Sequence, residues 1–355
     1  MNTSMRYFPP RRQAGLTLIE FMVAIVIGML MIAAMATLIA NQSTNRAEID
    51  RAGRLIENGR YAMSAIAVDA QLAGYWGEYN TAPGSGGPMD PCTTTVADIQ
   101  SDTLEHVQGF DESAADPSCV SNRKANTDIL VIRRAEPDSS DVETGGLVDF
   151  TKVKQGQLYL QTGLQAGIPS LQYRIAAGAA TAANNATAFN LTQKDTTKVA
   201  KVRKLNVHIY YVSKCSVEVS GSCTNADGGT PIPTLKRVEL TNSGGATSFT
   251  TVSMAEGIEN MQVDYGVDTN ADGMPDSYLG AASITTSAGW ASVMTARIYL
   301  LTRASETTPG YSDAGRTYSL GSYGTTSAAA GETGYRRHLF TQTVRFVNPA
   351  GRLTQ

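Results

Sequence analysis

The pattern of apolar and polar positions divides the chain into an N-terminal helix and a longer region of strands and loops. Residues 16–40 carry one charged residue and no proline. At about 1.5 Å per residue they span roughly 37 Å as a helix, which is enough to cross a bilayer core of about 30 Å. The pattern therefore predicts a membrane-spanning helix over 16–40.

The helix is expected to continue beyond the membrane as an amphipathic segment over 41–75. This segment also lacks proline, and its apolar side chains recur at spacings of three, four and seven. The apolar positions are Ile49, Leu55, Ile56, Met63, Ile66, Ala67 and Ala70. Such a stripe favours packing against a sheet. Gly74 and the glycine-rich stretch after it end the helix.

Beyond residue 76 the pattern changes to strands and loops. Strands are predicted over 128–134, 147–154, 157–161, 171–176, 204–212, 235–240, 261–267, 295–302 and 339–347. Strict alternation in 204–212 is typical of a half-buried strand. Residues 178–198 and 310–334 are predicted as long loops. A helix followed by antiparallel strands is an α+β architecture, with one globular domain over 76–355.

Composition and charge exclude several function classes. The 355 residues are 42% hydrophobic and 17% charged, which suits a sizeable core. The net charge is −3 and Lys and Arg are not concentrated anywhere, so we expect no direct nucleic-acid partner. The three histidines, His106, His208 and His338, are widely separated. The chain has no H-E-x-x-H, G-x-S-x-G or phosphate-loop motif, so a catalytic function is not expected.

The four cysteines are Cys92, Cys119, Cys215 and Cys223. Their even number fits disulfides in an oxidising compartment, and the absence of a C-x-x-C spacing disfavours zinc. Of the three possible pairings, Cys92–Cys119 and Cys215–Cys223 are favoured because short loops cost less entropy to close. The alternative is four reduced, buried thiols.

The residues in front of the apolar run are basic. Residues 1–15 contain three arginines and no acidic residue, so the positive-inside rule keeps this leader in the cytoplasm. A cleaved signal peptide has a shorter apolar core than 16–40. An ordinary membrane anchor does not explain Glu20, because a charge at the centre of a membrane helix costs about 2.5–3.5 kcal/mol, and somewhat less near an end. The carboxylate therefore indicates a partner or a function.

The sequence Gly15-Leu16-Thr17-Leu18-Ile19-Glu20 resembles the cleavage motif of type IV pilins and type II secretion pseudopilins. The resemblance implies that prepilin peptidase cuts between Gly15 and Leu16 and methylates the new N-terminal amine. Leu16 stands where Phe or Met is commoner in that family. The resemblance also implies that Glu20 pairs with the N-terminal amine of a neighbouring subunit, since two charges that are each costly in lipid then offset each other.

Further segments are similar to the PilW family of minor pilins. They are residues 54–77, 256–279, 290–303 and 340–349, so the resemblance covers roughly the first 80 and the last 110 residues. It implies a type IV pilin-like fold, with the long helix packed on an antiparallel sheet. It also implies membership of a priming complex that starts pilus assembly and stays near the tip.

The same resemblance implies the partners: other minor pilins and the major pilin through the N-terminal helix, prepilin peptidase, the inner membrane and a tip adhesin. Two alternatives stay open. One is a J-type minor pseudopilin of a type II secretion system. The other is a membrane-tethered, calcium-dependent binding module or hydrolase, for which the N-terminus would remain uncut.

One segment has the spacing of a calcium-binding loop. Oxygen atoms are available at positions one, three, five, seven and nine of the loop, from Asp268, Asn270, Asp272, the Met274 carbonyl and Asp276. This matches the first part of an EF-hand loop, with glycine at position six. Position twelve is Leu279, so the usual bidentate Glu is missing and another oxygen would be needed. The alternative is a turn between two strands, built from Asp and Asn.

Overall fold

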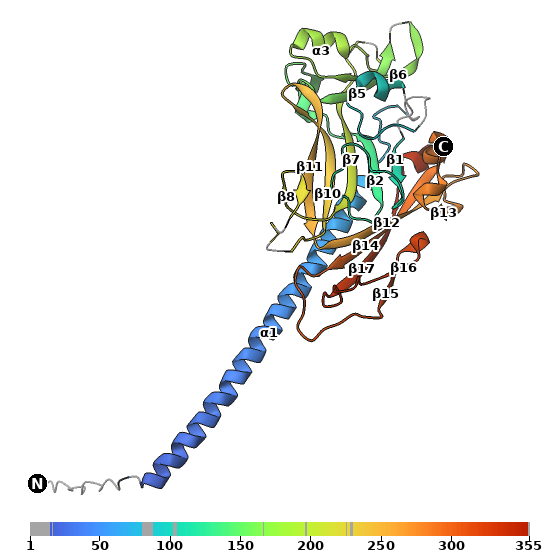
Figure 1. Ribbon diagram of the computed structural model, residues 1–355. Coiled ribbons are helices and arrows are strands. Elements are labelled where there is room, and N and C mark those ends of the chain that lie inside the picture. The colour runs from blue at the N-terminus through green and yellow to red at the C-terminus, as the bar shows by residue number, and fades with distance from the viewer. Residues whose placement is uncertain are drawn as a thin grey trace, which may run out of the picture. The chain divides into compact units, whose positions relative to one another are not determined.

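The computed structural model describes residues 15, 17–79, 88–101, 105–165, 167–195, 197–224, 226–227 and 230–353. They form one long N-terminal helix and antiparallel strands, so the predicted α+β pilin-like fold is confirmed (Figure 1). The chain divides into two compact units, residues 1–51 and 52–355, which are described in turn.

Helix α1 runs from Leu18 to Gln71. Its 54 residues contain no proline, so nothing interrupts the backbone hydrogen bonds along its length. The helix ends four residues before the predicted position 75. Gly74 follows the end with a φ of 72°, and its N–H donates to the carbonyl oxygen of Arg133 at 3.0 Å. Glycine at such a position adopts the left-handed conformation without steric cost.

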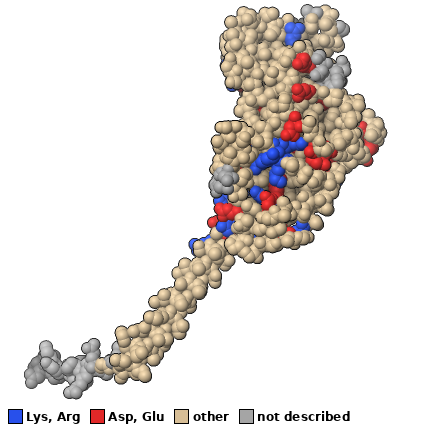
Figure 2. All heavy atoms as spheres, in the orientation of Figure 1, with Lys and Arg blue, Asp and Glu red and all other residues tan. Residues whose placement is uncertain are grey.

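In the first unit, α1 exposes its apolar side chains. Every large apolar side chain between residues 18 and 39 is between 41% and 78% exposed. Figure 2 shows this stretch as an uncharged surface on the face drawn. Among the described residues, α1 is the one helix that is long and apolar enough to cross a membrane, and its apolar stretch is not buried within the protein.

The larger sheet of the second unit has seven antiparallel strands in the order β1-β2-β7-β10-β11, with β5 paired to both β7 and β6. The strands are β1 (Val107–Phe110), β2 (Ile129–Ala135), β5 (Leu158–Gln165), β6 (Ile168–Ala177), β7 (Val202–Ser213), β10 (Thr234–Ser243) and β11 (Ala246–Glu256). Strand β11 was not predicted. Gly244 and Gly245, with φ of 58° and 83°, form the two-residue turn that pairs it with β10.

The smaller sheet has four antiparallel strands in the order β13-β12-β14-β17. They are β13 (Ser277–Leu279), β12 (Ile258–Val267), β14 (Val293–Arg303) and β17 (Arg337–Arg345). Gly257, with a φ of 78°, lies where the chain passes from β11 to β12, and a Cβ there would lie 2.6 Å from the Arg303 carbonyl oxygen. The strands therefore form two main sheets, whereas one was predicted.

The remaining elements are short. The hairpins are β3 (Glu143–Thr144) with β4 (Leu147–Val148), β8 (Glu218–Val219) with β9 (Ser222–Cys223), and β15 (Thr317–Ser319) with β16 (Thr325–Ser327). The helices are α2 (Val96–Ser101), α3 (Ala182–Ala188), α4 (Ser287–Ala291), α5 (Val347–Leu353), η1 (Ser140–Val142), η2 (Ala281–Ser283) and η3 (Gly321–Tyr323). The two predicted loops thus contain structure: α3 lies within 178–198, and the β15–β16 hairpin lies within 310–334.

The core has two main parts, one on each face of the larger sheet. On one face the C-terminal part of α1 packs against both sheets, for example Ile66 against a cluster that includes Leu130 and Leu300. On the other face Ile129 and Val131 pack in a separate cluster. Strands β2 and β7 are therefore buried on both faces, so the half-buried prediction for 204–212 is wrong. Its polar side chains at His208 and Tyr210 bond to Asp69 of α1 instead of facing solvent.

Candidate functional site

The start of α1 holds the carboxylate that the sequence singled out. Glu20 Oε2 accepts hydrogen bonds from the backbone N–H of Thr17 at 2.9 Å and from its hydroxyl at 2.8 Å. The Glu20 N–H lies 3.4 Å from Thr17 Oγ1 in return. This reciprocal pairing is a capping box, which satisfies N–H groups that the first turn of a helix leaves unpaired.

The predicted processing site lies directly before this turn. Gly15 is exposed, and a Cβ at its position would meet no atom within 4 Å. Leu16 lies outside the described residues. Cleavage, methylation and the pairing role of Glu20 stay predictions. The Thr17-x-x-Glu20 spacing, which is the sequence signature of a capping box, could have predicted the local role of Glu20.

Asp69 is the centre of a buried polar network between α1 and the larger sheet. Its Oδ1 accepts from Arg134 Nε at 2.8 Å, and its Oδ2 accepts from the Tyr210 hydroxyl at 3.0 Å and lies 2.6 Å from His208 Nδ1. Arg134 is on β2, and His208 and Tyr210 are two positions apart on β7, so their side chains share one face of the sheet. This network was not predicted, because nothing local in the sequence links residue 69 to residue 208.

The charges of this network set the pKa of Asp69. Burial raises the pKa, but hydrogen bonds and charge from His208 and Arg134 outweigh burial and hold it at about 2. Asp69 is therefore ionised at neutral pH, and the interaction fixes α1 to the larger sheet through charge-assisted hydrogen bonds.

The cysteines form two disulfides, Cys92–Cys119 and Cys215–Cys223, which are the two pairs that short loop closure favoured. The first links the segment before α2 to the loop between β1 and β2. The second closes the segment that contains the β8–β9 hairpin. Both tie down stretches of chain that have few regular backbone hydrogen bonds of their own.

The 268–276 loop is held by its own backbone. The two oxygens of Asp268 accept from the N–H groups of Asn270, Ala271 and Gly273 at 2.7–3.1 Å. Asp276 Oδ2 accepts from the N–H of Thr269 at 2.7 Å. Hydrogen bonds of this kind are those of a turn built from Asp and Asn.

The side chains of the other predicted ligands also form hydrogen bonds within that loop. Asn270 Nδ2 lies 3.3 Å from an oxygen of Asp272, and Asp272 Oδ1 accepts from the N–H of Met274 at 2.8 Å. The carboxylates that do gather within 4.8 Å of one another, in the part of the chain that the structure describes, belong to Asp111, Glu112 and Asp128. Calcium binding by the 268–276 loop stays a prediction.

Burial of Asp128 has an electrostatic consequence. It raises the pKa of this carboxyl to about 7, the backbone N–H of Val263 opposes the rise, and the negative charge of Asp111 adds to it. The sequence reasoning missed this cluster because its members lie at the two ends of a loop 17 residues apart.

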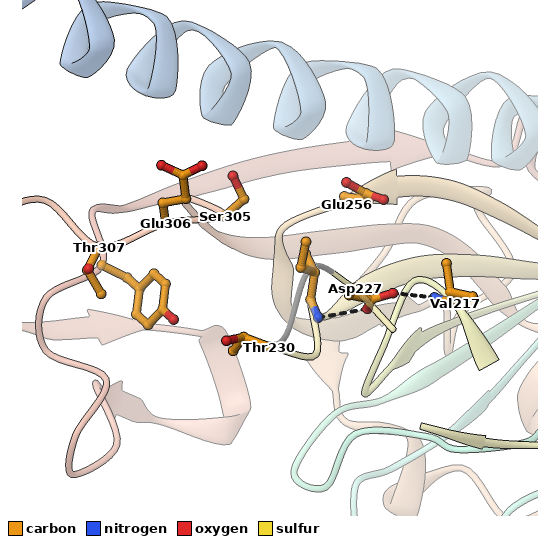
Figure 3. Close-up of a pocket in the computed structure, with 9 residues that line it drawn as sticks. Val217, Asp227, Thr230, Glu256, Ser305, Glu306 and Thr307 are labelled. Atoms are coloured by element: carbon orange, nitrogen blue, oxygen red, sulfur yellow. Dashed lines mark hydrogen bonds between the residues drawn. The ribbon is translucent and has the colours of Figure 1, made fainter. Parts of the chain in front are cut away.

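A groove of about 560 Å³ lies between the β8–β9 region and the segments around residues 305–307 and 335. Figure 3 shows Glu306 and Ser305 on one side and Asp227 with Val217 on the other. Asp227 accepts the N–H groups of Ser216, Val217 and Ile232 at 2.7–2.9 Å. The carboxylate therefore holds Val217 and Ile232, which line the groove, in place.

Comparison with protein families gives two matches. Residues 10–36 match the prokaryotic N-terminal methylation motif, and residues 209–348 match the family of type IV pilus-assembly protein W. The second match runs from within β7 to α5 and so includes all four strands of the smaller sheet. Searches of curated proteins and of solved structures returned no match.

An N-terminal methylation motif on an exposed apolar helix, joined to antiparallel sheets, defines the class of type IV pilin-like proteins. Within that class, residues 209–348 match the PilW family, and the two matches together support a type IV pilus minor pilin. The resemblance drawn from the sequence is thereby confirmed. The family is a structural component of pilus assembly.

Proposed function

We propose that this minor pilin is part of the priming complex that starts pilus assembly, and that it stays near the pilus tip. The observation that supports this most is the apolar stretch of α1, whose large side chains are exposed and whose first turn carries Glu20. Exposed apolar surface of this extent is stable in a bilayer or against other apolar helices.

The first step of the proposed pathway is cleavage between Gly15 and Leu16 by prepilin peptidase, followed by methylation of the Leu16 amine. In the precursor Glu20 bonds to Thr17 within its own chain. In the fibre, the charged N-terminal amine of a neighbouring subunit is a stronger partner for the carboxylate than a neutral N–H or hydroxyl group. Glu20 thus directs α1 towards other pilin helices.

The segments take corresponding places in the membrane. Residues 1–15 form the cytoplasmic leader, 16–40 span the inner membrane, 41–75 continue the helix and 76–355 form the domain in the periplasm. The two disulfides support an oxidising compartment for that domain. Other minor pilins and the major pilin are the proposed partners through α1, and a tip adhesin is the proposed cargo.

The test is complementation of a strain that lacks this chain, with pili counted and the tagged chain located by immunogold labelling. Wild type restores pili with label at the tips. Glu20→Ala gives a processed protein that stays in the membrane. Glu57→Ala is the matched control, because Glu57 is an exposed acid on the same helix beyond the apolar stretch. If the strain that lacks this chain makes a normal number of pili but no longer secretes proteins, the type II secretion alternative would be correct.

A further inference from the structure

Three carboxylates meet at the loop end of the β1–β2 pair. Phe110 pairs with Ile129 in the antiparallel register, so Asp111 and Asp128 are the next residues outwards on the two strands. Glu112 follows directly. One carboxylate oxygen from each of the three lies within 4.8 Å of the others. Ionised carboxylates this close repel one another unless a cation or a proton lies between them.

Arg123 lies in the same loop, but all of its N–H groups bond to atoms other than the oxygens of these three carboxylates. Its Nε pairs with Asp116 at 2.6 Å. Its terminal nitrogens donate to the backbone carbonyl oxygens of Asp111, Glu112, Ala114 and Thr127. An arginine has five N–H donors, and all five are accounted for. The guanidinium therefore fixes the backbone of the loop and leaves the three carboxylates without a directly bonded cation.

Two buried oxygens at this cluster have no hydrogen-bond partner among the described residues: Asp128 Oδ1 and the Tyr265 hydroxyl. Asp128 is 4% exposed and Tyr265 is fully buried. The Tyr265 hydroxyl lies against Gly109, two residues before Asp111 in the sequence, because it is the first atom that a Cβ at Gly109 would meet. Unpartnered buried oxygens are rare in native proteins, and each needs a partner such as a water molecule or an ion.

The other oxygens of Asp128 and Asp111 accept few hydrogen bonds within the protein. Asp128 Oδ2 accepts the Val263 N–H at 2.9 Å. The oxygens of Asp111 accept one N–H each, from Glu112 at 2.8 Å and from Ala282 at 3.4 Å. A carboxylate offers about four lone-pair sites, so every one of these groups retains acceptor capacity.

We propose that Asp111, Glu112 and Asp128 bind a divalent cation, and that this cation is calcium. Carboxylate oxygens are hard ligands, and calcium accepts irregular arrays of six to eight oxygens that water can complete. The Cys92–Cys119 disulfide in the same loop fits an oxidising compartment, where sites with a Kd of about 10⁻⁴–10⁻³ M are useful. The ion joins the two ends of the 111–128 loop and holds it against β1 and β2.

The experiment uses the detergent-solubilised full chain, stripped of metal with a chelator. Terbium, which replaces calcium at oxygen sites, is titrated while its emission is excited through nearby aromatic side chains. Calcium is then added to displace it. The variants are Asp111→Asn and Glu112→Gln, which keep side-chain size and lie at half-buried positions. Asp272→Asn, in the 268–276 loop, is the matched control, and melting temperatures in chelator show that each variant is folded.

The expected result is saturable terbium emission that calcium displaces, with affinity weakened at least about tenfold in Asp111→Asn and in Glu112→Gln, because charge count sets the affinity of such sites. Asp272→Asn keeps the emission that Asp111→Asn and Glu112→Gln weaken. Two results would overturn the proposal. One is the absence of binding to the wild-type chain, in which case a proton on Asp128 relieves the repulsion. The other is binding that Asp272→Asn abolishes and the two loop variants leave intact.

Discussion

Asp69 Oδ2 lies 2.6 Å from His208 Nδ1, and this contact joins α1 to β7 across 139 positions of the chain. Both residues are buried, with 5% of Asp69 and 9% of His208 exposed. Arg134 bonds to the other oxygen of Asp69 at 2.8 Å, so β2 as well as β7 helps to hold the helix. The contact determines how the helix docks on the folded domain, and it makes that docking sensitive to acid.

We expect the free energy of unfolding to fall as the pH is lowered from about 4 to 2. The folded-state pKa of Asp69 is about 2, below the ordinary value of 3.8. A depressed pKa contributes stability that is fully present above the unfolded value and is lost as the pH falls through the folded value. A difference of this size corresponds to about 2 kcal/mol. Chemical unfolding of the solubilised chain between pH 2 and 5 measures it.

Asp69→Asn is the control for this assignment. It should remove most of the pH dependence in that window and lower stability at pH 7 by about 3–5 kcal/mol, since it removes the buried carboxylate from His208 and leaves Arg134 paired with Glu136 alone. A variant with the same slope between pH 2 and 4 as wild type would show that other carboxylates carry the effect.

The second prediction compares two glycines of α1. A Cβ at Gly59 would lie 2.1 Å from the ring of Phe340 on β17, whereas a Cβ at Gly53 would meet nothing within 4 Å. Gly53→Ala should stabilise the chain by about 0.5–1 kcal/mol, because alanine is the better helix former. Gly59→Ala should destabilise it, because the ring must move. Thermal unfolding of both variants tests this, and recovery of stability in Gly59→Ala with Phe340→Leu identifies the clash.

The third prediction concerns Arg337, whose side chain is fully buried. It bonds to Asp313 at 3.0 Å and to Glu259 at 3.0 Å, which links β17 to β12 and to the segment after β14. Arg337→Met leaves two buried carboxylates uncompensated, so a loss of about 3–5 kcal/mol is expected. Arg60→Met, at an exposed position of α1, should change stability by less than about 0.5 kcal/mol.

Neutralising the acids should restore part of that loss. Combining Arg337→Met with Glu259→Gln and Asp313→Asn removes the two buried carboxylate charges that have lost their partner. The triple variant should therefore be more stable than Arg337→Met alone. If the triple variant is less stable still, packing of the arginine matters more than its charge.

The fourth prediction ranks the disulfides. Cys92–Cys119 joins residues 27 positions apart and Cys215–Cys223 joins residues 8 positions apart. The longer loop restricts the unfolded chain more, so replacing the first pair with serine should cost about 1 kcal/mol more than replacing the second. Chemical unfolding of the two double variants gives the comparison, and equal losses would count against the loop-entropy explanation.

Local pattern was sufficient for the features that depend on neighbours in sequence. The apolar run 16–40 and the absence of proline up to Gln71 predicted α1, alternation predicted β7, and the strand over 295–302 was predicted where β14 lies. The Gly244-Gly245 turn was an unused signal for β11. The half-buried prediction for β7 was wrong because α1 covers its polar face, and alternation alone does not say whether a polar face meets water or another helix.

The features that depend on residues far apart in the chain could not be predicted from the sequence. The division into two sheets occurs at Gly257, whose left-handed conformation is visible only in the structure. The Asp69–His208 contact and the meeting of Asp111 with Asp128 follow from how strands pair, which is a property of the whole fold. Conversely, Gly15, Leu16 and Glu20 could be proposed from the sequence because the cleavage motif that they resemble is linear.

The most direct test of the account is mass spectrometry of the N-terminal peptide from cells with active prepilin peptidase. The account predicts a chain that begins at Leu16 with a methylated amine, and a chain that keeps residues 1–15 in cells without the peptidase. Recovery of residues 1–15 still attached in the first cells would contradict the assignment of this chain as a processed pilin.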